Sequence, residues 1–190
     1  IMLGRHGASD LGAFAIAFAP VVFFMSASMG LMVGTLLSTS HAVGTGQLHI
    51  CGAVWQRSLP YALVLGGVLA ALCQFAEPFF HLTGQPEHLA VHGGAVMRIL
   101  GLHLPATALM TACIFFLEGL RQPLWGTLAL ILGNIIHFTI NLILIEGRFG
   151  FPAMGAEGAA WAMVVERWTI AVVLITLIWW HPDRHALGIR

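Results

Sequence analysis

Three polar side chains interrupt a long apolar run and are the first candidates for chemistry. Asn134, His137 and Asn141 lie within residues 124–145, a run long enough to cross a hydrocarbon core of about 30 Å as a helix. Their spacing of three and four residues places them on one helix face over about two turns. Because histidine changes charge near neutral pH and polar groups at membrane depth are usually functional, we predict that this stripe lines a substrate or ion pathway. The alternative for His137 is a hydrogen bond that packs two helices together.

Charged residues within other apolar segments form a second set of candidates. Glu166 and Arg167 are adjacent in sequence, so helical spacing predicts that they do not pair with each other on one face and that partners come from another helix or from water. Arg98 is one such partner, and an intramembrane ion pair between Arg98 and Glu166 is possible on this reasoning. Glu118 stands three residues before Arg121, a pattern that favours a structural turn over chemistry.

The histidines and cysteines invite a metal-binding interpretation. His88 and His92 are four residues apart and share a helix face, but they do not form the H-E-x-x-H motif and no third ligand follows from spacing. Interfacial histidines are the favoured interpretation. The cysteines, Cys51, Cys73 and Cys113, have no C-x-x-C spacing, so they predict neither a zinc site nor a disulfide framework and are expected to be small core residues.

Further side chains have weaker signals. His103 stands near Pro105, where carbonyls freed by the proline offer it a partner. Several apolar side chains could line an adaptable pocket for apolar cations, although packing is the favoured explanation for each of them. They are Met25, Met29, Met32, Phe138 and Trp161.

The composition decides which kind of scaffold must position these residues. The chain has 190 residues, of which 58% are hydrophobic and 8% charged, against about 25% charged residues in soluble domains. This indicates a multi-span membrane protein. The net charge is zero and lysine is absent, so nothing predicts a nucleic-acid partner.

Apolar runs predict five complete transmembrane helices, at about residues 13–37, 58–80, 93–117, 124–145 and 153–180. Residues 1–3 are expected to be the end of a sixth, and residues 41–50 a linker. Gly30 and Gly34 form a small-xxx-small pattern that predicts close helix approach, Pro20 could kink the first span, and Pro60 is placed near the first turn of the second. The fold class is therefore all-α, a polytopic membrane bundle.

The segments that flank the polar stripe resemble a known family. Residues 116–123 read FLEGLRQP, residues 133–136 read GNII, residues 141–145 read NLILI and residues 150–160 read GFPAMGAEGAA. In this order and spacing they closely resemble the multidrug and toxic compound extrusion (MATE) family, and the resemblance covers essentially the whole chain. The motif residues expected to have structural roles are Glu118, Gly119, Gln122, Pro123, Gly155 and Gly158.

The resemblance implies a twelve-helix transporter of two six-helix lobes in the cell (inner) membrane, not an enzyme. Residues 1–190 would be part of the N-terminal lobe, from late helix 1 to helix 6, and a C-terminal lobe would complete it. The full-length protein would expel amphipathic or cationic compounds by alternating access, in exchange for H+ or Na+ and without another cofactor.

The resemblance also places a polar network among helices 1, 5 and 6 of this lobe. The helix-5 members match His137, where an asparagine is expected, and Asn141, which is an aspartate in one branch. Met163 stands where a threonine is expected on helix 6, and a helix-1 carboxylate would precede Ile1.

Two alternatives remain open. A flippase for lipid-linked precursors has a related architecture, and a lumen lined by several arginines would favour it, whereas this chain offers only Arg98 and Arg167. A membrane-embedded metalloenzyme using histidine and glutamate would require bound metal.

Overall fold

The computed structural model describes residues 8–145, 147 and 152–189, and within these ranges the chain forms helices and turns without a strand. The helices are α2 (Ala8–Gly44), α3 (Leu48–Cys73), α4 (Ala76–Leu82), α5 (Glu87–Gly101), α6 (Leu104–Gly119), α7 (Pro123–Leu144) and α8 (Gly155–Trp179). Five segments are long and apolar enough to cross a membrane, namely Ser9–Gly44, Leu48–Cys73, Glu87–Gly119, Pro123–Leu144 and Gly155–Trp179. The expected all-α membrane bundle is confirmed, while residues 1–3 lie outside the described ranges.

The connection between the first two spans is much shorter than the predicted linker 41–50. Helix α2 continues to Gly44 and α3 begins at Leu48, because Gly46 adopts a φ of 73° that an L side chain rarely tolerates and reverses the chain at once. Pro60 consequently lies inside α3 instead of near its first turn, a position that transmembrane helices tolerate. The predicted second span also merged two elements, since α4 is a separate short helix after α3.

The third span is interrupted in its middle. Helix α5 ends at Gly101 and α6 begins at Leu104, and tight turns bridge them, with the amides of Leu102 and His103 donating to carbonyls three residues back. Pro105 causes the break because it has no N–H and its ring would clash with the carbonyl of Gly101.

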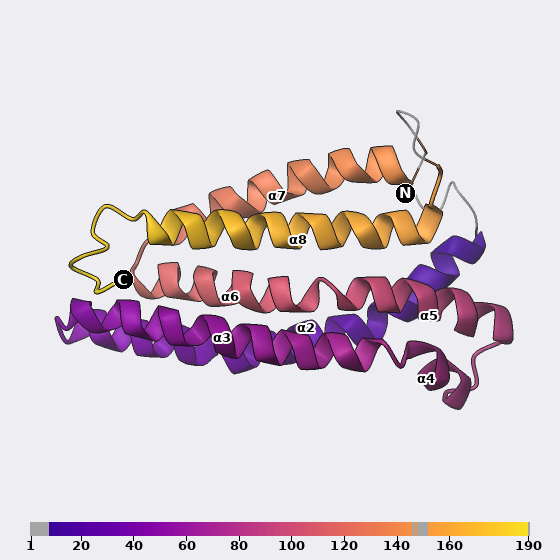
Figure 1. Cartoon of the computed structure of the whole chain (residues 1–190), viewed down its shortest axis with the longest axis horizontal. Helices are drawn as coiled ribbons and strands as arrows, with labels where there is room; N and C mark the ends of the chain where they lie inside the picture. The colour runs from indigo at the N-terminus through magenta and orange to yellow at the C-terminus, as the bar shows by residue number, and fades with distance from the viewer. Residues whose placement is uncertain (1–7, 146, 148–151, 190) are drawn as a thin grey trace.

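Helix α6 forms the centre of the bundle. Figure 1 shows α5 and α6 running between α8 on one side and α2 and α3 on the other, with α7 outside α8. Most α6 side chains are buried. At its core the indole N–H of Trp55 donates to Cys113 Sγ at 3.5 Å, and the Trp55 ring lies 5.9 Å from that of Phe116. The three cysteines are buried and form no disulfide.

Glycines on α2 and α3 make different contacts. A Cβ atom at Gly30 or Gly34 would meet nothing within 4 Å, so the predicted close approach is not made by the part of the chain that the structure describes. Gly66, in contrast, packs directly against the backbone at Leu104 and Pro105. Close helix contact therefore falls where α3 meets the break in the third span.

Residues after α8 fold back across the N-terminal end of α3. The amide of Gly52 donates to the carbonyl of Leu187 at 2.7 Å, and Leu187 and Ile189 are buried. Gly188, with a φ of 73°, lets the backbone lie against His49. This contact joins α3 to the residues after α8 at one end of the bundle (Figure 1).

Candidate functional site

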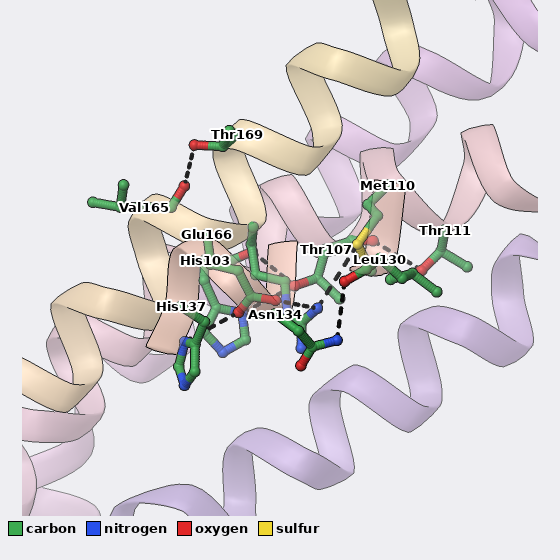
Figure 2. A network of polar contacts seen from close by, with 11 residues as sticks. His103, Thr107, Met110, Thr111, Leu130, Asn134, His137, Val165, Glu166 and Thr169 are labelled. Carbon is green, nitrogen blue, oxygen red and sulfur yellow. Dashed lines mark hydrogen bonds and ion pairs between the residues drawn. The ribbon is translucent and has the colours of Figure 1, made fainter. Parts of the chain in front are cut away.

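A buried carboxylate on α8 meets a histidine of α7 inside the bundle. Glu166 is 5% exposed, and its Oε2 lies 3.3 Å from His137 Nδ1, within ion-pair distance although outside hydrogen-bond geometry. Figure 2 shows the two side chains pointing toward each other. A substituent on Gly133, one turn before His137, would reach Ile170 and come within 3.4 Å of Glu166 Oε1. The absence of a side chain at Gly133 therefore allows α7 and α8 to bring this pair together.

Glu166 also pairs with the next residue, contrary to the prediction from helical spacing. Arg167 Nη1 lies 3.3 Å from Glu166 Oε1. The prediction was wrong because it considered the Cβ directions and neglected the long arginine side chain, whose planar end can turn back toward a neighbour. The same Nη1 lies 3.8 Å from Met110 Sδ on α6, so Arg167 connects the carboxylate to the central helix.

The possible pair between Arg98 and Glu166 is not formed. Arg98 Nη2 instead donates to Glu77 Oε2 at 2.7 Å, and its Nε donates to the carbonyl of Gly94 at 3.3 Å. Glu77 lies on α4, which the sequence prediction had merged into the second span. Arg98 was assigned to the wrong partner because the turn that creates α4, and directs Glu77 toward α5, was missed.

The three residues of the stripe on α7 lie in different surroundings. Asn134 is exposed and donates to the carbonyl of Leu130 in its own helix at 2.9 Å. Asn141 is half-buried, and its Oδ1 accepts no hydrogen bond from the described residues. Only His137 faces a charged partner across the helix interface. The spacing on α7 is as predicted, but its members have three different environments.

The break between α5 and α6 lies beside His137, Glu166 and Arg167. It contributes a fourth ionisable group, His103. His103 is fully buried, and its ring lies beside Glu166 (Figure 2). Thr107 Oγ1 donates to the backbone carbonyl of His103 at 3.0 Å. Because that hydroxyl proton is already used, His103 Nδ1–H donates to Thr107 Oγ1, also at 3.0 Å. The partner is thus a hydroxyl and not the freed carbonyl that Pro105 suggested. A freed carbonyl at Leu102 accepts instead from the indole of Trp168 on α8, at 3.1 Å.

An open-sided cavity adjoins the cluster formed by His103, His137, Glu166 and Arg167, which we call the ionisable cluster. Its volume is about 440 Å³, and most of its lining is apolar, with contributions from α2, α6, α7 and α8. The lining residues are Phe18, Val22, Met25, Ser26, Met29, Thr107, Met110, Thr111, Ile114, Phe115, Glu118, Leu130 and Arg167. The side chain of Glu118 is exposed, and no ion pair joins it to Arg121 in the described part of the chain.

Two of the five predicted pocket residues line this cavity. Met25 and Met29 do so, whereas Met32 is buried in the core at 1% exposure. Phe138 on α7 and Trp161 on α8 are exposed and are not part of the lining. The composition of the chain gave no signal that separates these two groups, since all five are apolar residues on helices.

The motif residues that carried the family resemblance lie at turns and close helix contacts. Arg121 has a φ of 62°, and Pro123 begins α7. The amide oxygen of Gln122 lies 2.9 Å from His181 Nε2 after α8.

The glycines of these motifs meet neighbouring backbone and side chains. A Cβ at Gly119 would come within 2.6 Å of Thr39 Cβ on α2, and one at Gly158 within 2.8 Å of the Leu144 carbonyl. Gly155 has a φ of 51° at the start of α8. Gly150 and Phe151, which open the last motif, lie outside the described residues.

No metal centre is apparent in residues 8–145, 147 and 152–189. Within these ranges no three side chains of His, Cys, Asp or Glu lie close enough to hold a metal ion. His88 is exposed, in keeping with a position near the membrane interface.

Comparisons with known proteins agree on one family. The MatE family model matches residues 1–143. The chain is 36% identical over its whole length to the probable multidrug resistance protein NorM of Caulobacter vibrioides and covers 40% of that protein. It is 29% identical to the probable multidrug resistance protein YoeA of Bacillus subtilis, with 97% of this chain and 40% of that protein covered. The chain thus spans about 40% of the length of the curated relatives it matches.

Solved structures share the fold. The eukaryotic MATE transporter AtDTX14 superposes with a TM-score of 0.91 at 21% identity, covering all of this chain and 42% of that one. A MOP superfamily transporter from Pyrococcus furiosus gives a TM-score of 0.80 at 20% identity, covering 97% and 40% respectively.

Proposed function

The chain belongs to the MatE family, and on that premise we propose that it forms most of the N-terminal lobe of a two-lobe multi-pass membrane transporter. In this proposal the full-length protein expels amphipathic or cationic compounds by alternating access, in exchange for H+ or Na+. Multidrug resistance proteins among its relatives and the five apolar spans support the proposal. The C-terminal lobe would supply the length that the chain lacks relative to those proteins.

The observation that carries the proposal is the contact between the cavity and the ionisable cluster. Arg167 lines the cavity and also pairs with the buried Glu166. Antiport requires that substrate and coupling ion affect each other's binding, which is a coupling free energy between two sites. A charged side chain that belongs to both sites provides a direct physical route for that coupling.

The cavity fits a flexible, apolar molecule with a positive charge. Methionine and phenylalanine side chains form adaptable apolar walls, and the exposed carboxylate of Glu118 lies at the lining. The negative charge of Glu166 is already balanced by Arg167. Glu118 is therefore the carboxylate at the cavity that remains to attract a cation. Asn134, His137 and Asn141 remain the proposed ion pathway along α7.

The flippase alternative has less support in this lobe. Of the two arginines it relied on, Arg98 is paired with Glu77 away from the cavity, and Arg167 is the only arginine in the described cavity lining. A single guanidinium neutralised by its neighbour gives little attraction for a polyanionic lipid headgroup. No specific observation favours the metalloenzyme alternative.

Transport itself is tested by expressing the full-length protein in cells that lack their own efflux pumps. We expect lower accumulation of ethidium, a cationic dye, than in cells carrying an empty vector, and we expect a protonophore or removal of Na+ to abolish the difference. Equal dye accumulation, with the protein present in the membrane fraction, would contradict the proposed function.

Replacing Glu118 by glutamine is expected to weaken transport of cationic substrates selectively. The change keeps the side-chain shape and removes the charge, which contributes on the order of 1 kcal/mol at a partly solvated site, or roughly fivefold in affinity. The measurement is the ethidium concentration that gives half-maximal efflux, compared with that of a neutral substrate. Glu87→Gln is the matched control, because Glu87 is exposed near His81 on another part of the surface. Equal effects on charged and neutral substrates would remove Glu118 from the binding site.

A further inference from the structure

We propose that Glu166 and His137 form one proton-binding site, at which this lobe takes up H+ as its coupling ion and not Na+. This inference rests on the proposed function and adds to it the ion and the residue that holds it. From the sequence, Glu166 was considered only as a member of a possible intramembrane ion pair with Arg98.

The site lies at membrane depth and is enclosed by helices. Glu166 stands near the middle of α8 (Gly155–Trp179), roughly 16–20 Å from either end at a rise of 1.5 Å per residue. Its side chain is 7% exposed and that of His137 is 32% exposed. A carboxylate placed there is costly unless it is paired or neutralised. The free energy of the lobe therefore depends on whether Glu166 is protonated and on whether it is paired.

The groups around the carboxylate favour a proton over a sodium ion. Hard cations such as Na+ require several oxygen ligands, as Ca²⁺ and Mg²⁺ do, whereas both oxygens of Glu166 face nitrogen groups. Oε1 faces the guanidinium of Arg167 and Oε2 faces the imidazole of His137, each at 3.3 Å. Arginine stays protonated in proteins, so its charge repels a metal cation at the carboxylate. A proton, in contrast, can bind to the imidazole and be stabilised by the adjacent carboxylate.

Within the described ranges, the ion pairs of Glu166 are made by His137 and Arg167. On α7 the titratable group that faces Glu166 is His137, and in the turn before α6 it is His103, whose Nε2 accepts no hydrogen bond within these ranges. Glu118 of α6 lies at the cavity lining. Arg98 of α5 is bound to Glu77. The titratable residues of α2, Asp10 and His41, lie in its first and last turns.

The charge balance of the cluster gives a coupling mechanism. With a neutral His137, the charges of Glu166 and Arg167 cancel. A proton taken up from water onto the free ring nitrogen of His137 gives the cluster one net positive charge beside the cavity that Arg167 lines. This charge repels a cationic substrate there, and a bound substrate conversely promotes release of the proton. The two ligands therefore exclude each other, as exchange requires.

Transport by the full-length protein in proteoliposomes tests the proposal. We expect the wild type to move ethidium under an imposed pH gradient without Na+, and its rate to change several-fold as the pH is varied. His137→Asn, which keeps a polar group but does not titrate, should reduce the gradient-driven rate at least fivefold and flatten the pH profile. Glu166→Gln should do the same. His88→Asn is the control, because it removes an exposed histidine and should leave the profile unchanged.

A second measurement does not depend on turnover. In weakly buffered detergent solution, addition of ethidium to the purified wild type should release protons, while His137→Asn should bind the dye and release none. Glu166→Gln leaves Arg167 uncompensated beside the cavity, so it should bind the dye more weakly and also release none. An unchanged pH profile in both variants, proton release equal to the wild type, or transport driven by Na+ alone would overturn the proton site and leave the transport function intact. If the wild type transports no substrate at all, the proposed function fails, and the dye-binding measurement then decides separately whether the pair binds protons.

Discussion

Alanine at Gly66 is expected to destabilise the bundle by about 1–3 kcal/mol, the usual cost of an added methyl in a well-packed interior. A Cβ atom there would lie 2.7 Å from Pro105 N and 2.9 Å from the carbonyl oxygen of Leu104, and in contact with Pro105 Cα. These are backbone atoms at the α5–α6 break, held by the proline ring and by the amide of Thr107, which donates to the carbonyl of His103 at 2.8 Å. The neighbour therefore cannot yield as a flexible side chain would.

Gly67→Ala is the matched control for this effect. It makes the same chemical change on the same helix, but a Cβ at Gly67 meets nothing within 4 Å. The higher helix propensity of alanine should leave this variant at or slightly above the wild type. Thermal unfolding of the full-length protein in detergent, followed by size-exclusion fluorescence, should show a midpoint several degrees lower for Gly66→Ala alone. Equal midpoints for the two variants would mean that α3 does not pack against the break as described.

Strong local signals allowed much of the helical bundle to be predicted. Pro123 at one end of α7 and His181–Pro182 just after α8 are helix-boundary residues, and the predicted bounds of these two spans differ from the structure by no more than two residues. The start of α3 was missed because residues 41–50 were interpreted as a linker and the second span was placed from residue 58. The first turn of α3 contacts the C-terminal residues through Gly52 and His49, and no local pattern records such a tertiary contact.

The candidate site could be predicted only in part, because helix rotation is a tertiary property. The spacing of Asn134, His137 and Asn141 correctly predicts one face of α7, but not which member of that face turns toward α8. The relevant signal was the pairing of Gly133 with Ile170, one turn from His137 and Glu166 respectively. A small residue on one helix opposite a branched residue on the next fixes the rotation of both, and it becomes visible only when the two helices are placed together.

Removing the guanidinium of Arg167 is expected to have the largest effect on stability in this lobe. Arg167→Met keeps a long apolar side chain but removes the guanidinium, which leaves Glu166 without its fixed positive partner and Met110 Sδ without its contact to Nη1. Breaking a buried ion pair from one side typically costs about 3–5 kcal/mol, because the remaining charge is uncompensated. We therefore expect a large fall in unfolding midpoint at neutral pH. Arg57→Met, at an exposed arginine, should lower it little.

The cause can be separated from simple loss of packing by a double variant. Glu166→Gln, Arg167→Met has no unpaired charge and should recover most of the lost stability, since replacing both members of a buried pair is often nearly neutral. If the double variant is as unstable as Arg167→Met, Arg167 acts through its contact with α6 and not through Glu166.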